Sequence, residues 1–150
     1  MAQQRDRPYA QFNFLVYLGT GNTDGPHAGF QECSEIGMSV DVVEYRNGNE
    51  KENSVRKLTG LARYPDVTLK RGIIGSLDLY AWLNDIRNGN QTALRTVVVQ
   101  LMNEDHSAVV QEWQLMRARI VKHVSGPFNA KDSSVAMEEI TLAYERLEME

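Results

Sequence analysis

The sequence predicts a mainly β fold, an antiparallel β-barrel or sandwich with one α-helix packed against it. Apolar residues alternate with a period of two along most of the chain, which is typical of strands. Only one segment, about residues 76–88, repeats with the period of a helix. The length of 150 residues and the 42% hydrophobic content fit one globular domain, residues 1–150, with a single core.

Alternating apolar residues predict three strands in the first half of the chain: 12–18, 38–46 and 66–71. In the first of these, Leu15 and Tyr17 fill positions between other apolar residues, so we expect a strand that is buried mostly on both faces. The third segment alternates more cleanly. Its Val67 and Leu69 are expected to face the core, and the polar residues between them to face solvent.

The helix is predicted by a stripe of apolar residues at helical spacing: Leu79, Trp82, Leu83 and Ile86. These positions fall at i, i+3, i+4 and i+7, so the stripe is expected to be buried against the outside of the barrel. Ser76 is suited to cap the amino end of the helix, and Asn88 with Gly89 to end it. Asp78, in the first turn, is expected to face solvent.

Four further alternating segments complete the predicted fold: 94–102, 108–115, 117–124 and 135–147. The polar stretch 103–107 is expected to join the first two as a hairpin. The last segment places Ile140 and Leu142 on one face, which is typical of a half-buried strand, although its Glu and Ala content leaves a helix as the alternative. Glu138 and Glu139 are adjacent, so on a strand they point to opposite faces.

Residues 47–60 are almost entirely polar and predict a long extended loop of fourteen residues, and loops of that length are usually functional or disordered. This loop lies in a basic region, because residues 46–71 hold seven Lys or Arg against three Asp or Glu. Residues 138–150 are acidic, with five Glu against one Arg. A chain with a basic middle and an acidic end can complement the charges of a neighbouring copy.

The residue pattern predicts no catalytic, cofactor-binding or metal-binding site. His27, His106 and His123 lack the spacing of a metal site, and Cys33 has no predicted base beside it, so it is expected to be a small core residue. The net charge of −4 argues against a basic nucleic-acid-binding domain. The longest apolar runs are too short to cross a membrane, and we expect no secretory signal at the amino end.

The middle of the chain carries four specific blocks in order: GFQECSEI (29–36), VVEYRNG (42–48), VRKLTGLARYPDVTLKRG (55–72) and LYAWL (79–83). Together they resemble the tail-tube (inner tube) proteins of contractile injection systems and phage-tail-like particles, the T4-type tail tube family. The resemblance spans nearly the whole chain. Thr59 stands where the family often has proline, and Glu35 where glycine is common, which affects only local loop shape.

The resemblance implies a tail-tube-like fold and a structural function, with no enzyme activity and no cofactor. Such proteins form hexameric rings whose strands join into one inner barrel, and the rings stack into a hollow tube inside a contractile sheath. Contraction drives the tube through a target envelope, and cargo travels in the lumen. The implied partners are the chain itself, the sheath protein, baseplate and tube-terminator proteins, and a lumenal cargo or effector. Nucleic acid is implied only for a true phage tail, and no membrane for the monomer. Assembly is expected in the cytoplasm, into an injection particle or a virion tail.

Within this family, the basic loop and the acidic C-terminal region predict an interface between subunits or rings. Its candidate residues are Arg46, Glu50, Lys51, Glu52, Arg56, Lys57, Leu58, Arg63, Lys70, Arg71, Glu138 and Glu139. Two alternatives remain open. One is a tube initiator or terminal-cap paralogue of the same particle. The other, from a different class, is a monomeric ligand-binding β-barrel, which would stay near 17.0 kDa while tube proteins form rings or filaments.

Overall fold

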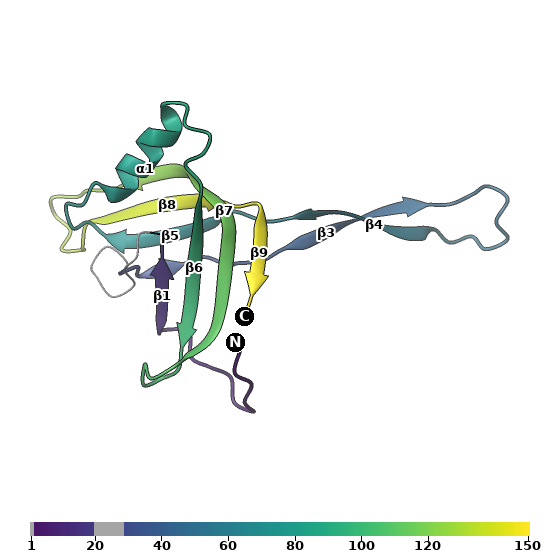
Figure 1. Ribbon diagram of the computed structural model, residues 1–150, viewed down its shortest axis with the longest axis horizontal. Helices are drawn as coiled ribbons and strands as arrows, with labels where there is room; N and C mark the ends of the chain where they lie inside the picture. Colours follow the sequence, from purple (N-terminus) through teal and green to yellow (C-terminus); the bar gives the residue numbers. More distant parts are fainter. Residues whose placement is uncertain (1, 20–28) are drawn as a thin grey trace.

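The computed structural model describes residues 2–19 and 29–150, which form a β body, one helix and a long projecting arm (Figure 1). His27 lies outside the described residues. The strands of the body are β1 (Phe14–Tyr17), β2 (Glu32–Cys33), β5 (Val67–Gly72), β6 (Arg95–Met102), β7 (Val109–Ser125), β8 (Met137–Ala143) and β9 (Arg146–Met149). The arm is made by β3 (Ser39–Tyr45) and β4 (Arg56–Arg63), and the helix is α1 (Asp78–Arg87).

The body strands pair antiparallel in one sheet of order β1-β6-β7-β8-β5-β2, and β9 adds to β7. The long strand β7 serves two sets of partners. Residues 109–118 pair with β6, residues 113–116 also pair with β9, and residues 119–125 pair with β8. Arg117 lies at this changeover with φ 52, a left-handed backbone that is uncommon outside glycine. The segments predicted as two strands are therefore one strand with a kink.

The sheet turns back on itself along β7, and the two halves enclose the core. Val67 and Leu69 of β5 are fully buried and lie opposite Leu142 and Ile140 of β8. Thr68 and Lys70, which alternate with these residues on β5, are only half-buried. The inward and outward faces predicted for these strands are confirmed, because successive side chains on a strand point to opposite faces.

The predicted last strand is two strands. β8 ends at Ala143, and after Tyr144 and Glu145 the chain crosses to the other half of the sheet as β9. The phenol of Tyr144 donates a hydrogen bond to the Gly37 carbonyl at 2.9 Å, which holds this corner against the chain that leads to the arm. Uninterrupted alternation along 135–147 concealed the change of partner.

Helix α1 lies at the upper end of the sheet in Figure 1. Leu79 and Trp82 are buried, and Leu83 and Ile86 pack half-buried against the core, so the predicted stripe is confirmed. The indole nitrogen of Trp82 donates to the Ala93 carbonyl at 2.8 Å. The N-cap predicted at Ser76 is wrong, because the residue at the N-cap is Leu77 and no side chain caps the helix, which runs only from Asp78 to Arg87. Within the described residues, no helix has the length and apolar character needed to cross a membrane.

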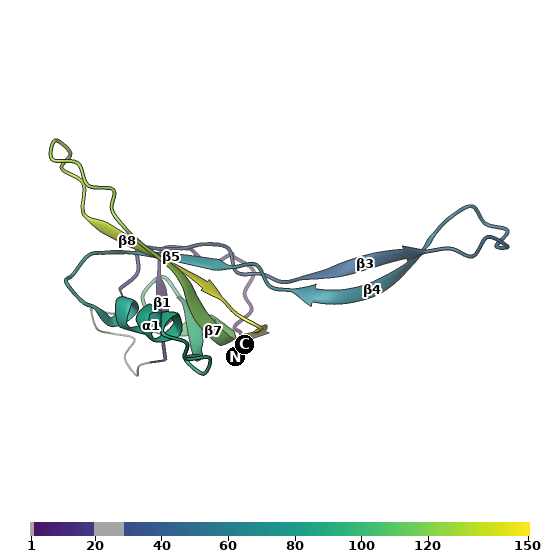
Figure 2. The ribbon, with the colours of Figure 1, turned by 90° about the horizontal axis from the view of Figure 1, so that it is seen from above.

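The largest departure from prediction is the arm. Residues 56–60, expected in a polar loop, lie in β4 and pair with β3, so that Leu58 faces Val43 and Lys57 faces Glu44. Only residues 46–55 connect the two strands. Figures 1 and 2 show the arm projecting well beyond the body. Polar composition hid this strand, because both faces of β4 are exposed and no apolar alternation marks it.

Candidate assembly interface

The arm exposes apolar side chains along both of its strands. Every residue of β4 is exposed, as are most of β3. The large apolar side chains that face solvent on the arm and its base are Met38, Val40, Val42, Val43, Tyr45, Val55, Leu58 and Leu61. The two strands form a sheet of their own, separate from that of the body. A two-stranded hairpin is marginally stable alone in water, so this surface is suited to being covered by a partner.

Charged side chains of the arm are partly neutralised within it. The Arg46 guanidinium donates to the carbonyls of Glu50 and Glu52 at 3.0 and 3.1 Å, which closes the tip. Arg56 forms an ion pair with Glu50 at 3.1 Å, and Arg63 pairs with the carboxylate of Asp41 at 2.7 Å. Pairs this exposed contribute about 0–1 kcal/mol each to stability.

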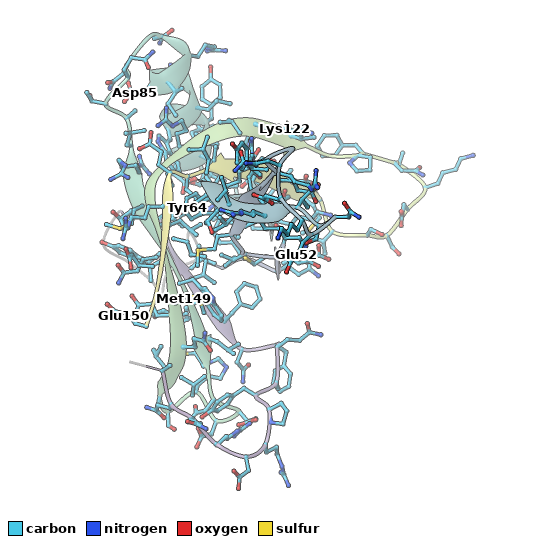
Figure 3. All side chains as sticks on the ribbon, turned by 90° about the vertical axis from the view of Figure 1, so that its right-hand side faces the viewer. Glu52, Tyr64, Asp85, Lys122, Met149 and Glu150 are labelled. Atoms are coloured by element: carbon cyan, nitrogen blue, oxygen red, sulfur yellow. The ribbon has the colours of Figure 1, made fainter. Side chains whose placement is uncertain are left out.

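Lys51 and Lys57 carry charges that no ion pair within the described chain neutralises. Figure 3 looks along the arm from its tip, where Glu52 lies, toward Tyr64 at its base. In this view the arm lies in front of the body, while Figures 1 and 2 show that it extends away from the body. Eight of the predicted interface residues, from Arg46 to Arg63, are therefore brought together on one projecting element.

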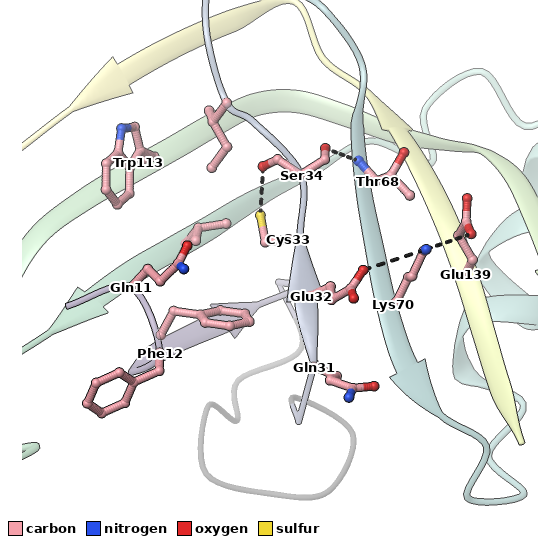
Figure 4. A pocket seen from close by; sticks show the side chains of 13 residues that line it. Gln11, Phe12, Gln31, Glu32, Cys33, Ser34, Thr68, Lys70, Trp113 and Glu139 are labelled. Carbon is pink, nitrogen blue, oxygen red and sulfur yellow. Dashed lines mark hydrogen bonds and ion pairs between the residues drawn. The ribbon is translucent and has the colours of Figure 1, made fainter. Parts of the chain in front are cut away.

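Two other predicted interface residues lie on the outward face of the body. Lys70 of β5 is 3.6 Å from the carboxylate of Glu32 and 3.8 Å from that of Glu139, and β2, β5 and β8 supply these three side chains in one row (Figure 4). The row is open to solvent, so Lys70 and Glu139 remain accessible to a neighbour.

The last two, Arg71 and Glu138, are in the interior, and their assignment to an exposed interface is wrong. Arg71 is 1% exposed. Its guanidinium donates to Glu138 at 2.5 Å and to Asp78 at 2.6 Å. Glu138 also contacts the Nε2 atom of His123 at 3.1 Å. This buried cluster joins β5, β8, β7 and α1, so it supports the body rather than a neighbour.

Asp78 is therefore half-buried and ion-paired rather than turned to solvent as predicted. Burial by itself would raise the pKa of Asp78, but hydrogen bonds from Arg71 and Ser76 outweigh this and lower it. The alternation of residues along β5 could have indicated this cluster, because Arg71 follows Val67 and Leu69 on the inward face of the strand. A charged residue at such a position requires a buried partner.

A groove of about 870 Å³ lies between β1 and β2, the two end strands of the sheet (Figure 4). Its walls mix apolar side chains, with Phe12, Phe14 and Trp113 among them, and polar ones such as Glu32 and Lys70. Burial raises the pKa of the Cys33 thiol in this wall to about 11, which keeps it protonated and unreactive. Among residues 2–19 and 29–150, no group of three or more His, Cys, Asp or Glu side chains is placed to hold a metal ion.

The model of the T4-like virus tail tube protein gp19 family matches residues 10–148. The chain belongs to this tail tube family. Its function is that of a structural tube protein, as the sequence predicted, and the mainly β fold with one helix is likewise confirmed. No curated protein matches the chain.

Solved structures extend this assignment. The chain is 26% identical, with TM-score 0.83, to a chain of the PVC sheath–tube complex of an extracellular contractile injection system in its extended state, covering 97% of this chain and 93% of that one. It is 27% identical, also with TM-score 0.83, to a chain of the anti-feeding prophage tube-terminating cap, covering 100% and 94%. Hcp1 from Flavobacterium johnsoniae, at 14% identity and TM-score 0.54 over 91% and 93%, shares the fold.

Sequence reasoning located the arm's charges but missed its apolar surface. Two-residue alternation places Val40 and Val42 on one face of the strand predicted at 38–46, and Val43 and Tyr45 with Asp41 on the other. A strand with apolar residues on both faces is normally buried. Here both faces are exposed. The sequence did indicate this exposure, because the segment that follows the strand, residues 47–60, is almost entirely polar and has few apolar side chains to cover either face of it.

Proposed function

We propose that this chain is a non-enzymatic structural subunit of the inner tube of a contractile injection system or phage tail. Hexameric rings of the chain stack into a rigid hollow tube that is driven through a target envelope and carries cargo in its lumen. Tail tube family membership over residues 10–148 supports this function. The observation that carries the proposal is the arm, whose exposed apolar side chains and separate two-stranded sheet favour a neighbouring subunit as its cover.

The proposed partners follow from assembly into such a particle. They are further copies of the chain, a contractile sheath, a baseplate and a tube terminator. The solved structures similar to this chain come from a sheath–tube complex and a tube-terminating cap. The proposed site of assembly is the cytoplasm, and the product is an injection particle or a virion tail.

A second candidate function is that of a tube initiator or terminal cap. It is favoured by the similarity to the anti-feeding prophage cap, which equals that to the PVC sheath–tube complex in TM-score. Negative-stain microscopy and analytical ultracentrifugation of the purified chain separate the two. Long tubes are expected from a main tube subunit, and single rings from a cap. A chain that stays monomeric at high concentration contradicts both and returns the ligand-binding barrel to consideration.

The role of the arm is tested by reversing two of its exposed charges. Arg56→Glu/Lys57→Glu is expected to leave the circular dichroism spectrum unchanged, because exposed charges contribute little to folding, while blocking tube elongation. Arg7→Glu/Lys122→Glu makes the same change in net charge on exposed body residues and serves as the matched control. Tubes of parental length from the arm variant contradict this role, and an unfolded spectrum shows that the arm supports the fold instead.

A further inference from the structure

A second exposed apolar surface lies at the end of the body remote from the arm. It comprises Phe128 and Val135 of the β7–β8 loop with Ile73 and Ile74 of the adjoining β5–α1 loop, and we call it the distal patch. Phe128 is 71% and Val135 73% exposed, among the highest values for large apolar side chains in the described chain. Figures 1 and 2 show the β7–β8 loop and the arm at opposite ends of the molecule. Exposed apolar clusters of this kind mark interaction sites.

Backbone hydrogen bonds hold the distal patch in place. The Ile73 amide donates to the Ala136 carbonyl, and the Gly126 amide to the Met137 carbonyl, both at 2.9 Å. Asp132 accepts hydrogen bonds from the Ser134 amide at 3.0 Å and from its hydroxyl at 2.8 Å. The β7–β8 loop encloses a hollow of about 830 Å³ whose walls include Phe128 and Val135. The apolar side chains of the distal patch therefore lie on a loop that hydrogen bonds hold in place.

The arm and the distal patch match each other in character. Both expose large apolar side chains, and both carry charges that form no ion pair within the described chain. These are Lys51 and Lys57 on the arm, and Asp132 with the adjacent Lys131 beside the patch. Hydrogen bonds from Ser134 lower the pKa of Asp132, so this carboxylate stays ionised at neutral pH. A contact between one arm and one patch would cover two apolar surfaces and pair two opposite charges.

Geometry favours this contact over a symmetric one. Pairing arm with arm would leave every distal patch in water. A contact between different surfaces at opposite ends of two copies is heterologous, and heterologous contacts propagate into rings or open filaments. We propose that the distal patch receives the β3–β4 arm of a second copy of this chain. The proposal rests on the proposed tube function and names the surface that its arm contacts.

Cross-linking between variants that each carry one introduced cysteine tests the contact directly. Leu58→Cys chains are mixed with Val135→Cys chains, allowed to assemble, and treated with a short bismaleimide. Cys33 reacts slowly, because burial raises its thiol pKa to about 11. Cross-linked dimers between the two variants are expected to exceed, by roughly tenfold or more, those formed with exposed Gln91→Cys as the matched control, because docking raises the effective concentration of the two thiols.

Assembly seen by microscopy separates failure of this contact from failure of the tube function. Rings or tubes in which Leu58→Cys links no better to Val135→Cys than to Gln91→Cys overturn the proposed contact and leave the tube function intact. A parent chain that never assembles, in microscopy and ultracentrifugation, overturns both.

A second variant tests the distal patch without a cross-linking reaction. Phe128→Ala is expected to keep its circular dichroism spectrum and to raise the concentration needed for assembly roughly tenfold or more, the effect of losing one buried aromatic side chain from a contact. Tyr80→Ala removes another exposed aromatic ring, on α1, and is expected to assemble like the parent. Assembly of Phe128→Ala at the parental concentration overturns the proposal.

Discussion

Replacing Arg71 with methionine is expected to lower the free energy of unfolding by about 3–5 kcal/mol, because it leaves a buried carboxylate without its cation. Arg71 is 1% exposed and Glu138 is 7% exposed, so water cannot take over the hydrogen bond that spans 2.5 Å between them. Leaving Asp78 without Arg71 costs less free energy, because the Asp78 side chain is 30% exposed and water can solvate it. Most of the expected cost therefore comes from Glu138.

The measurement is thermal unfolding at neutral pH, followed by circular dichroism under conditions that keep the chain unassembled. For a domain of this size each kcal/mol moves the melting temperature by about 2–4 °C, so Arg71→Met is expected to melt roughly 6–20 °C below the parent. Lys70→Met is the matched control, since Lys70 is the preceding residue on the same strand. Its ion pairs are exposed and long, at 3.6 and 3.8 Å, so its loss is expected to cost about 0–1 kcal/mol.

The double variant Arg71→Met/Glu138→Met distinguishes an unpaired charge from lost packing. Removing both partners removes the uncompensated carboxylate, so the double variant is expected to be more stable than Arg71→Met alone. His123, which contacts Glu138, lies at the edge of the cluster with its side chain 18% exposed. The reasoning is refuted if Arg71→Met melts at the same temperature as Lys70→Met. It is also refuted if Arg71→Met/Glu138→Met is no more stable than Arg71→Met.

Three further predictions concern the helix, the thiol and the amino-terminal segment. Trp82→Ala is expected to cost about 3–5 kcal/mol in urea unfolding, because Trp82 is 2% exposed; a midpoint equal to the parent's contradicts its place in the core. Cys33 is expected to react far more slowly with a thiol reagent at pH 8 in the folded than in the unfolded chain, since its pKa is raised to about 11 by burial; equal rates contradict this. The hydrogen bond from Arg5 lowers the pKa of Glu104 from 4.5 to about 2. This link is therefore complete above pH 4.5 and is expected to be lost as the pH falls toward 2, which an NMR titration of the Arg5 side chain detects and an Arg5→Gln variant should abolish.

Local pattern was sufficient for the elements whose exposure alternates along the chain. Val67 and Leu69 face the core, and Trp82 lies in a buried helical stripe, as their spacing predicted. Such patterns can be recognised in the sequence because side chains return to the same face every two residues in a strand and every 3.6 residues in a helix, whatever the element packs against. The ordered blocks between Gly29 and Leu83 resemble the tail tube family for a related reason, since they combine these patterns with specific turns and loops.

Partners that are distant in the sequence were decided only by the tertiary structure. Arg71 and Glu138 are separated by 67 positions, and neither residue type indicates burial by itself, so both were assigned to the surface. Strand β4 was read as a loop for the opposite reason. It pairs with β3 through backbone hydrogen bonds while both faces stay exposed, and backbone pairing leaves no mark on side-chain composition.

The sequence by itself therefore determined the fold class, the helix, the inward faces of β5 and β8 and the family. The tertiary structure decided which charges are buried, where β7 changes partners, and that the polar segment after Asn47 is half of an arm. The physical reason is the range of the interactions. Periodic burial is encoded residue by residue, whereas an ion pair or a strand pairing depends on where the rest of the chain places its second member.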